Sequence, residues 1–140
     1  MIIIQGEMGS GKSKLAMDLL KHKKKGLYLI LDKDHSVIQR LKKEKMNYTF
    51  MTNCLLMDIK YRILERGGLM NNDLDYVVVD SLNKIKDDTS YLEKIKYLQE
   101  VEKDFGLKII LTHNILRMLD KIPKKLKDID GVKIIEVRHP

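Results

Sequence analysis

The sequence predicts an α/β fold, a three-layer sandwich in which helices cover both faces of a mainly parallel five-stranded sheet. Short apolar runs alternate with amphipathic segments along the whole chain. The apolar runs lack polar residues at alternate positions, which is typical of strands buried on both faces. A glycine-rich stretch, residues 6–13, lies where the first strand would pass into the first helix.

Five apolar runs are predicted to be strands: residues 1–5, 27–31, 76–79, 108–112 and 132–137. Residues 48–51 are a further, short strand candidate outside that count. The last run contains the charged residues Lys133 and Glu136, and this mixture favours an edge position in the sheet.

Four segments have apolar residues spaced three and four positions apart, which predicts amphipathic helices: residues 12–22, 36–45, 53–66 and 90–105. Asn53 can cap the third helix, and Thr89 or Ser90 can cap the fourth. Right-handed crossovers between these strands make a doubly wound sheet, in which ligands bind beyond the carboxyl ends of the strands.

Length and composition limit the possible function classes. The chain has 140 residues, so we expect a single domain over residues 1–140. No apolar run approaches the ~20 residues that a membrane span needs. The only cysteine, Cys54, excludes an intrachain disulfide and a Cys-only zinc site, so we expect a buried structural residue and a cytoplasmic location. The net charge of +7 permits a polyanionic partner, although most of it comes from lysine.

Residues 6–13 fit the phosphate-loop pattern G-x-x-x-x-G-K-[ST]. Glycines let the backbone curl so that successive N–H groups point at phosphates, and the following helix adds its positive dipole end. Lys12 can reach the β- and γ-phosphates, and the Ser13 hydroxyl can coordinate magnesium. The predicted nucleotide-binding residues are Glu7, Met8, Gly9, Ser10, Gly11, Lys12 and Ser13.

The buried run before Asp80 supplies the acid that a magnesium nucleotide requires. This is a Walker B element, and together with Ser13 it predicts ATP and Mg²⁺ as cofactors. Many ATP hydrolases place a catalytic glutamate directly after this aspartate, but here Ser81 follows it. A water-activating base would therefore come from elsewhere.

Three acids are candidates for that base. Asp32 and Asp34 follow the second strand, where a carboxylate could face the γ-phosphate, and Glu7 lies inside the loop. The strand over residues 108–112 is followed by His113 and Asn114, which could sense the γ-phosphate, orient water or simply end the strand.

In this order the motifs resemble those of the RecA-like ATPases, which include DnaB-type helicases and recombinases. The resemblance rests on four places: residues 6–13, 31–34, 77–81 and 111–114. It implies that Asp34 activates water, with Asp32 next in line, and that Asn114 is the strand-end sensor. The family usually has glutamate at the position of Asp34. Because the loop begins at residue 6, the chain looks like a core-only version.

The resemblance also implies partners. The family contacts DNA through loops near and after the sensor strand, where the candidate residues here are Arg117, Lys121, Lys124 and Lys125. Members often complete a neighbour's site in trans, and Arg138 is the candidate finger. We therefore expect a homo-oligomeric ring or filament that binds nucleic acid, with single-stranded DNA favoured over RNA.

Three functions are compatible with these residues. The favoured one is a Mg²⁺-dependent ATPase that acts on nucleic acid in recombination, replication or repair. The second is a small nucleoside or metabolite kinase, with residues 115–131 as a lid, although arginines are few for such a lid. The third is a non-catalytic nucleotide-binding accessory subunit, which a weak base would favour.

Overall fold

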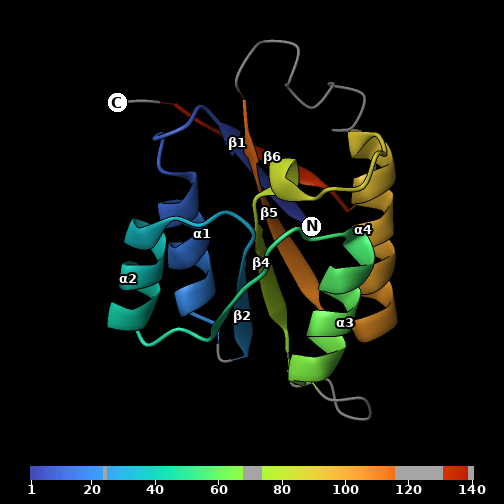
Figure 1. Cartoon of the computed structure of the whole chain (residues 1–140), viewed down its shortest axis with the longest axis horizontal. Helices are drawn as coiled ribbons and strands as arrows, with labels where there is room; N and C mark the ends of the chain where they lie inside the picture. Colours follow the sequence, from blue (N-terminus) through green and yellow to red (C-terminus); the bar gives the residue numbers. More distant parts are fainter. Residues whose placement is uncertain (24, 68–73, 116–130, 139–140) are drawn as a thin grey trace.

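The computed structural model describes residues 1–23, 25–67, 74–115 and 131–138. Its elements alternate between strands and helices along the chain (Figure 1). The strands are β1 (Ile2–Gly6), β2 (Gly26–Ile30), β3 (Tyr48–Phe50), β4 (Tyr76–Asp80), β5 (Lys108–Asn114) and β6 (Lys133–Val137). The helices are α1 (Lys12–Lys21), α2 (His35–Lys43), α3 (Leu56–Gly67), the 3-10 helix η1 (Leu82–Lys84) and α4 (Tyr91–Phe105).

The strands form one parallel sheet in the order β3-β2-β4-β5-β1-β6. Helices α1 and α2 cover one face, and α3 and α4 cover the other (Figure 1). The three-layer α/β prediction and the edge position of the last strand are confirmed. The sheet has six strands, so the count of five was one short. The missing strand, β3, is a short edge strand that pairs with β2 and has no fully apolar run.

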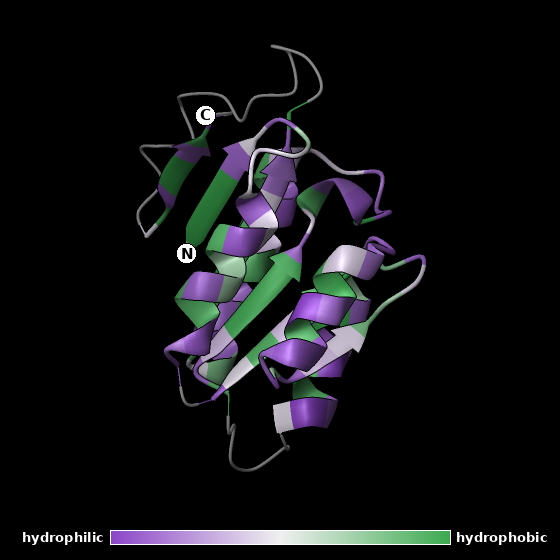
Figure 2. Ribbon diagram, turned by 90° about the vertical axis from the view of Figure 1, so that its left-hand side faces the viewer, coloured by the Kyte–Doolittle hydropathy of each residue, from purple (hydrophilic) through white to green (hydrophobic). Residues whose placement is uncertain are grey.

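Alternation along the strands divides the core between the two faces of the sheet. In β2, Tyr28 and Ile30 pack with residues of α1 and α2, whereas Leu27 and Leu29 pack with residues of α3 and α4. All four side chains are almost fully buried. Figure 2 shows the same division, with hydrophobic strands behind helices whose outer faces are hydrophilic.

The start of α3 differs from the prediction. Asn53 has a positive φ of 50° and does not cap the helix, which begins three residues later at Leu56. Its first N–H groups are satisfied from downstream instead. The N–H of Leu55 donates to the Asp58 carboxylate at 2.8 Å, and that of Leu56 donates to Asp87 at 2.6 Å. The acid that replaces a local cap therefore comes partly from a distant loop.

Two smaller expectations were also tested. Ser90 caps α4, because its hydroxyl accepts from the N–H of Glu93 at 3.1 Å. Cys54 is buried, and burial raises the pKa of its thiol to about 12, which suits a structural residue. None of the described helices is both long and apolar enough to cross a bilayer.

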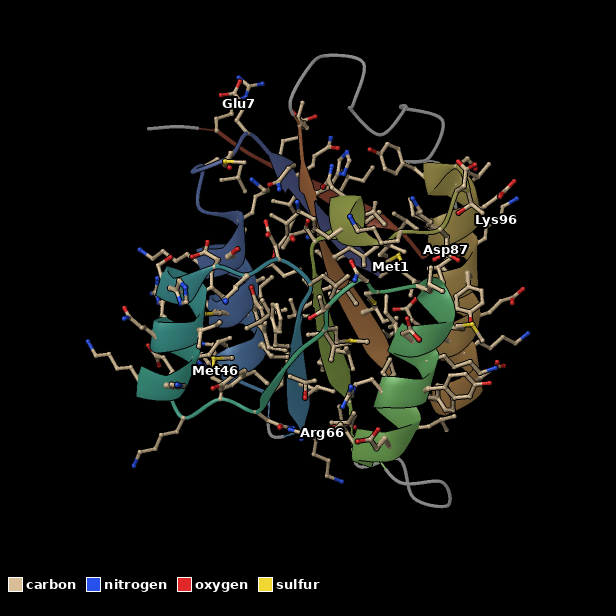
Figure 3. All side chains as sticks on the ribbon, in the orientation of Figure 1. Met1, Glu7, Met46, Arg66, Asp87 and Lys96 are labelled. Carbon is tan, nitrogen blue, oxygen red and sulfur yellow. The ribbon has the colours of Figure 1, made fainter. Side chains whose placement is uncertain are left out.

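Helix α4 offers a direct test of this layering. Leu98 is fully buried against the sheet, whereas Lys96 on the same helix points outward (Figure 3). We predict that Leu98→Ala lowers the free energy of unfolding by about 2–5 kcal/mol, because it leaves a cavity in the core. The matched variant Lys96→Ala should change it by less than about 0.5 kcal/mol. Urea denaturation measures both, and equal effects would contradict the layering.

Candidate functional site

The carboxyl ends of the strands surround a pocket of about 410 Å³. Because all strands are parallel, the residues that follow each strand reach the same edge of the sheet. The strand order places β5 between β1, which leads into the loop, and β4, which ends at Asp80. Eight of the predicted site residues line the pocket: Met8, Gly9, Gly11, Lys12, Ser13, Asp34, Asp80 and Asn114.

The loop after β1 has a backbone that requires glycine. Gly9 and Gly11 have φ values of 78° and 94°, a left-handed conformation that other residues rarely adopt. Gly6 is restricted by space, because a Cβ there would meet the carbonyl oxygen of Val137 and lie 2.7 Å from the Ser10 hydroxyl. Strand β6 thus packs directly against the first residue of the loop.

Lys12 is only 6% exposed and lies on the inner side of the loop. Its ammonium group donates to the carbonyl oxygen of Glu7 at 2.6 Å and to the Ser10 hydroxyl at 3.4 Å. Burial lowers the pKa of Lys12, and the negative charge of Asp80 partly offsets that effect. Lys12 therefore ties the loop to itself and brings a cationic group to the pocket wall.

The Asp80 carboxylate accepts hydrogen bonds from three hydroxyl groups. Ser13 donates to one oxygen, Oδ2, at 2.8 Å, and Thr112 donates to the other, Oδ1, at 2.7 Å. The Tyr28 phenol donates to Oδ2 as well. These donors come from α1, β5 and β2, so a single carboxylate connects the loop helix to the two strands beside β4.

Sheet register explains why these side chains meet. Asp80 pairs with Ile30 of β2, so Tyr28, two residues earlier, lies on the same face and reaches the carboxylate diagonally. On the other side, Val79 pairs with Leu111, which places Thr112 beside Asp80. Sequence analysis missed Tyr28 and Thr112, although a tyrosine inside an apolar strand signals a hydroxyl that needs a buried partner.

The residues at this edge fit a magnesium–triphosphate complex. The Ser13 hydroxyl and the Asp80 carboxylate are the hard oxygen ligands that Mg²⁺ prefers. In the described ranges no three His, Cys, Asp or Glu side chains form a metal cluster. Mg²⁺ commonly binds through one or two protein oxygens plus phosphates and water, and this site suits that arrangement. The Ser81 hydroxyl, also on the pocket wall, is buried and has no hydrogen-bond partner among the described residues.

Asp34 lines the pocket, but it also caps α2. Its Oδ1 accepts from the N–H of Ser36 at 3.0 Å, from the Ser36 hydroxyl at 2.7 Å and from the N–H of Val37 at 3.4 Å. The hydrogen bond from the Ser36 side chain is the main cause that lowers the pKa of Asp34. A carboxylate with a lowered pKa is a weaker base. Of the other base candidates, Asp32 lines the pocket and Glu7 does not.

The side chain of Asn83 positions Asn114. Its amide donates to the Asn114 carbonyl oxygen at 3.0 Å and accepts from the Asn114 N–H at 2.7 Å, so η1 continues the edge pairing of β5. His113 is fully buried, and its ring lies edge-on to the Tyr91 ring, with centroids 4.8 Å apart. Asn114 reaches the pocket, whereas His113 is not among its lining residues.

Two basic regions have different outcomes. Arg40 of α2 was not predicted, yet it is half-buried and lines the pocket opposite the loop. The predicted nucleic-acid residues Arg117, Lys121, Lys124 and Lys125 lie outside the described residues. Arg138 is exposed and directly follows Val137, whose carbonyl packs against Gly6. The finger candidate therefore lies next to its own phosphate loop.

Comparison with known proteins adds to this geometry. No family model and no curated protein matches the sequence. Among solved structures, the ATPase domain of a DnaB-type helicase superimposes on 92% of the chain with a TM-score of 0.62 and 14% sequence identity. The chain has a RecA-like P-loop fold. It spans 63% of the length of that helicase domain, which is less than two thirds. The RecA-like core thus accounts for nearly all of the described chain.

The cap at Asp34 gives a testable prediction. Asp34→Ala should lower the free energy of unfolding by about 1 kcal/mol at pH 7, whereas Asp34→Asn should lower it much less, because asparagine also caps helices. Folding lowers the pKa of Asp34, so its contribution is complete above the ordinary value of 3.8 and is lost as the pH falls through the lower folded-state value. Denaturation at several pH values measures the difference between wild type and Asp34→Ala. Equal stability at pH 7 would show that Asp34 is not a cap.

Proposed function

We propose that residues 1–140 are a single P-loop domain that binds ATP with Mg²⁺ and hydrolyses it while acting on nucleic acid. The observation that carries this proposal is the contact between Ser13 and Asp80, 2.8 Å across the pocket. It joins the last residue of the phosphate loop to the acid at the end of β4. Two motifs 67 positions apart in sequence thus form one oxygen-rich site.

The proposed roles follow from these positions. The backbone N–H groups of residues 7–13 bind the phosphates, and Lys12 neutralises charge on the β- and γ-phosphates. Ser13 and Asp80 hold magnesium, which would neutralise the charge that develops during phosphoryl transfer. Lys12 would exchange its present acceptors, the Glu7 carbonyl and the Ser10 hydroxyl, for phosphate oxygens. The cost of that exchange is small because both sets of acceptors are oxygen atoms.

We propose Asp34 as the residue that activates water, with Asn114 as the sensor of the γ-phosphate. Every hydrogen bond that the described residues make to Asp34 uses Oδ1, which leaves Oδ2 for water. The lowered pKa makes this carboxylate a weak base, so we expect slow basal turnover. Asp32 and Glu7 remain alternatives for this role, and Asp32 has the better position because it lines the pocket.

The proposed partner is nucleic acid, with single-stranded DNA favoured. Support comes from the net charge of +7 and from four basic residues that follow β5, the sensor strand. These are Arg117, Lys121, Lys124 and Lys125. We further propose a ring or filament in the cytoplasm, in which Arg138 contacts a neighbour's nucleotide. Its exposure and its place beside the loop permit such a contact.

Two observations favour other functions strongly enough to require a test. The capping role and lowered pKa of Asp34 favour a nucleotide-binding accessory subunit that does not hydrolyse ATP. The pocket extends from the loop to α2, where Ser36 and Arg40 line it, and this polar extension suits the acceptor of a small kinase.

Phosphate release from ATP, measured with and without single-stranded DNA, separates these functions. We predict clear stimulation by DNA for the wild type and no measurable release for Lys12→Ala, because Lys12 is the loop cation that neutralises the transferred phosphate. Lys21→Ala is the control, since Lys21 belongs to the same helix but pairs with Asp18 at its far end, 3.4 Å away. ATP binding without release would favour the accessory subunit, and transfer of phosphate to a small acceptor would favour the kinase.

In the same assay, Asp34→Asn should keep nucleotide binding and the helix cap but lose DNA-stimulated release. Retained release would exclude Asp34 as the base, and the same substitution at Asp32 would then be the next variant to measure.

A further inference from the structure

We propose that Tyr28 and Thr112 are positioning residues for magnesium, because together they hold the Asp80 carboxylate in the orientation that the metal site requires. We call this pair the hydroxyl clamp. The inference rests on the proposed function, since it concerns the same magnesium–nucleotide site. It adds a role for two residues that belong neither to the phosphate loop nor to the Walker B strand.

The first argument is geometric. The hydroxyl clamp holds Asp80 from both sides, because Tyr28 lies on β2 and Thr112 lies on β5, the two neighbours of β4. Thr112 donates to Oδ1 at 2.7 Å, and Tyr28 donates to Oδ2. One donor for each carboxylate oxygen opposes rotation of the group in either direction. Without such donors the terminal torsion of an aspartate is broad, and its oxygens have no preferred direction.

The second argument is burial. Tyr28 and Thr112 are both 0% exposed, so water does not compete for their hydroxyl protons. The Tyr28 ring packs in the core beneath α1 and α2 with Ile30, Leu41 and Val78. Burial, with a smaller effect of the Asp80 charge, raises the pKa of the phenol and keeps it a donor. A phenol whose ring is immobile in the core can hold its acceptor in one place.

The third argument concerns Ser13. Its hydroxyl has one proton and two lone pairs, so it can donate to Asp80 and still offer an oxygen to a metal ion. This works only while the Asp80 oxygen faces Ser13. The clamp therefore supports both the metal ligand Asp80 and, through it, the orientation of Ser13. Removing one clamp hydroxyl leaves the loop intact but lets the carboxylate turn.

Isothermal titration of the whole chain with ATP, once with Mg²⁺ and once with EDTA, tests the clamp without depending on turnover. The quantity of interest is the magnesium enhancement, the ratio of the two dissociation constants. Tyr28→Phe removes only the hydroxyl, and Thr112→Val removes the other donor at nearly constant volume. We expect each to reduce the enhancement about tenfold and to leave affinity in EDTA unchanged, because a hydrogen bond to a charged group is worth roughly that factor.

Two comparisons distinguish a positioning role from a loss of packing. Tyr76→Phe is the matched control, because Tyr76 packs against the same core cluster but its ring faces Lys23 at 4.5 Å and not Asp80. It should keep the full enhancement. In an Asp80→Asn background, Tyr28→Phe should cause no further loss, since the clamp acts through the carboxylate. Thermal melts identify any variant that fails to fold, and if Tyr28→Phe does not fold, Thr112→Val decides the proposal.

The outcomes separate the two proposals. A wild type that binds no ATP, or binds it equally well with Mg²⁺ and EDTA, would overturn the proposed function. A wild type with a clear enhancement, retained in every folded clamp variant, would overturn the clamp alone. An equal loss in Tyr76→Phe would also overturn it, because the effect would then come from the core and not from Asp80.

Discussion

The arrangement of the site depends on one carboxylate at the edge of the sheet. Asp80 stands at the end of β4, and three hydroxyl groups from α1, β2 and β5 converge on it. The phosphate loop follows β1, which is separated from β4 by β5, so no direct strand pairing sets the distance between loop and acid. The Ser13 contact sets that distance, and Tyr28 and Thr112 set the direction of the carboxylate. The same interaction therefore closes the core beneath α1 and builds the edge where a metal would bind.

Much of the fold was predictable, because strands buried on both faces leave a strong signal in an α/β protein. The five apolar runs all became strands, and their parallel arrangement followed from the helices between them. The errors occurred where that signal is weak. Strand β3 is three residues long and only partly buried, so its sequence has no apolar run to detect. The start of α3 depends on Asp87, a long-range partner that no local pattern contains.

The site was predictable where a motif encodes backbone geometry and unpredictable where it depends on sheet register. The phosphate loop and Asp80 carry their chemistry in consecutive residues. Tyr28 meets Asp80 only because two strands pair in one register, which the sequence does not state. Asp34 shows the converse problem, since an acid after a strand suits both a base and a helix cap. The structure gives it a cap's hydrogen bonds and a place on the pocket wall, so one residue couples the start of α2 to the chemistry beside the loop.

A crystal structure of the chain grown with Mg²⁺ and a non-hydrolysable ATP analogue tests the central claim most directly. The account predicts that the triphosphate lies in the loop over residues 6–13 and that the metal lies between Ser13 and Asp80. It also predicts that Tyr28 and Thr112 still donate to the two carboxylate oxygens. A nucleotide bound elsewhere, or a metal whose coordination sphere includes neither Ser13 nor Asp80, would contradict it.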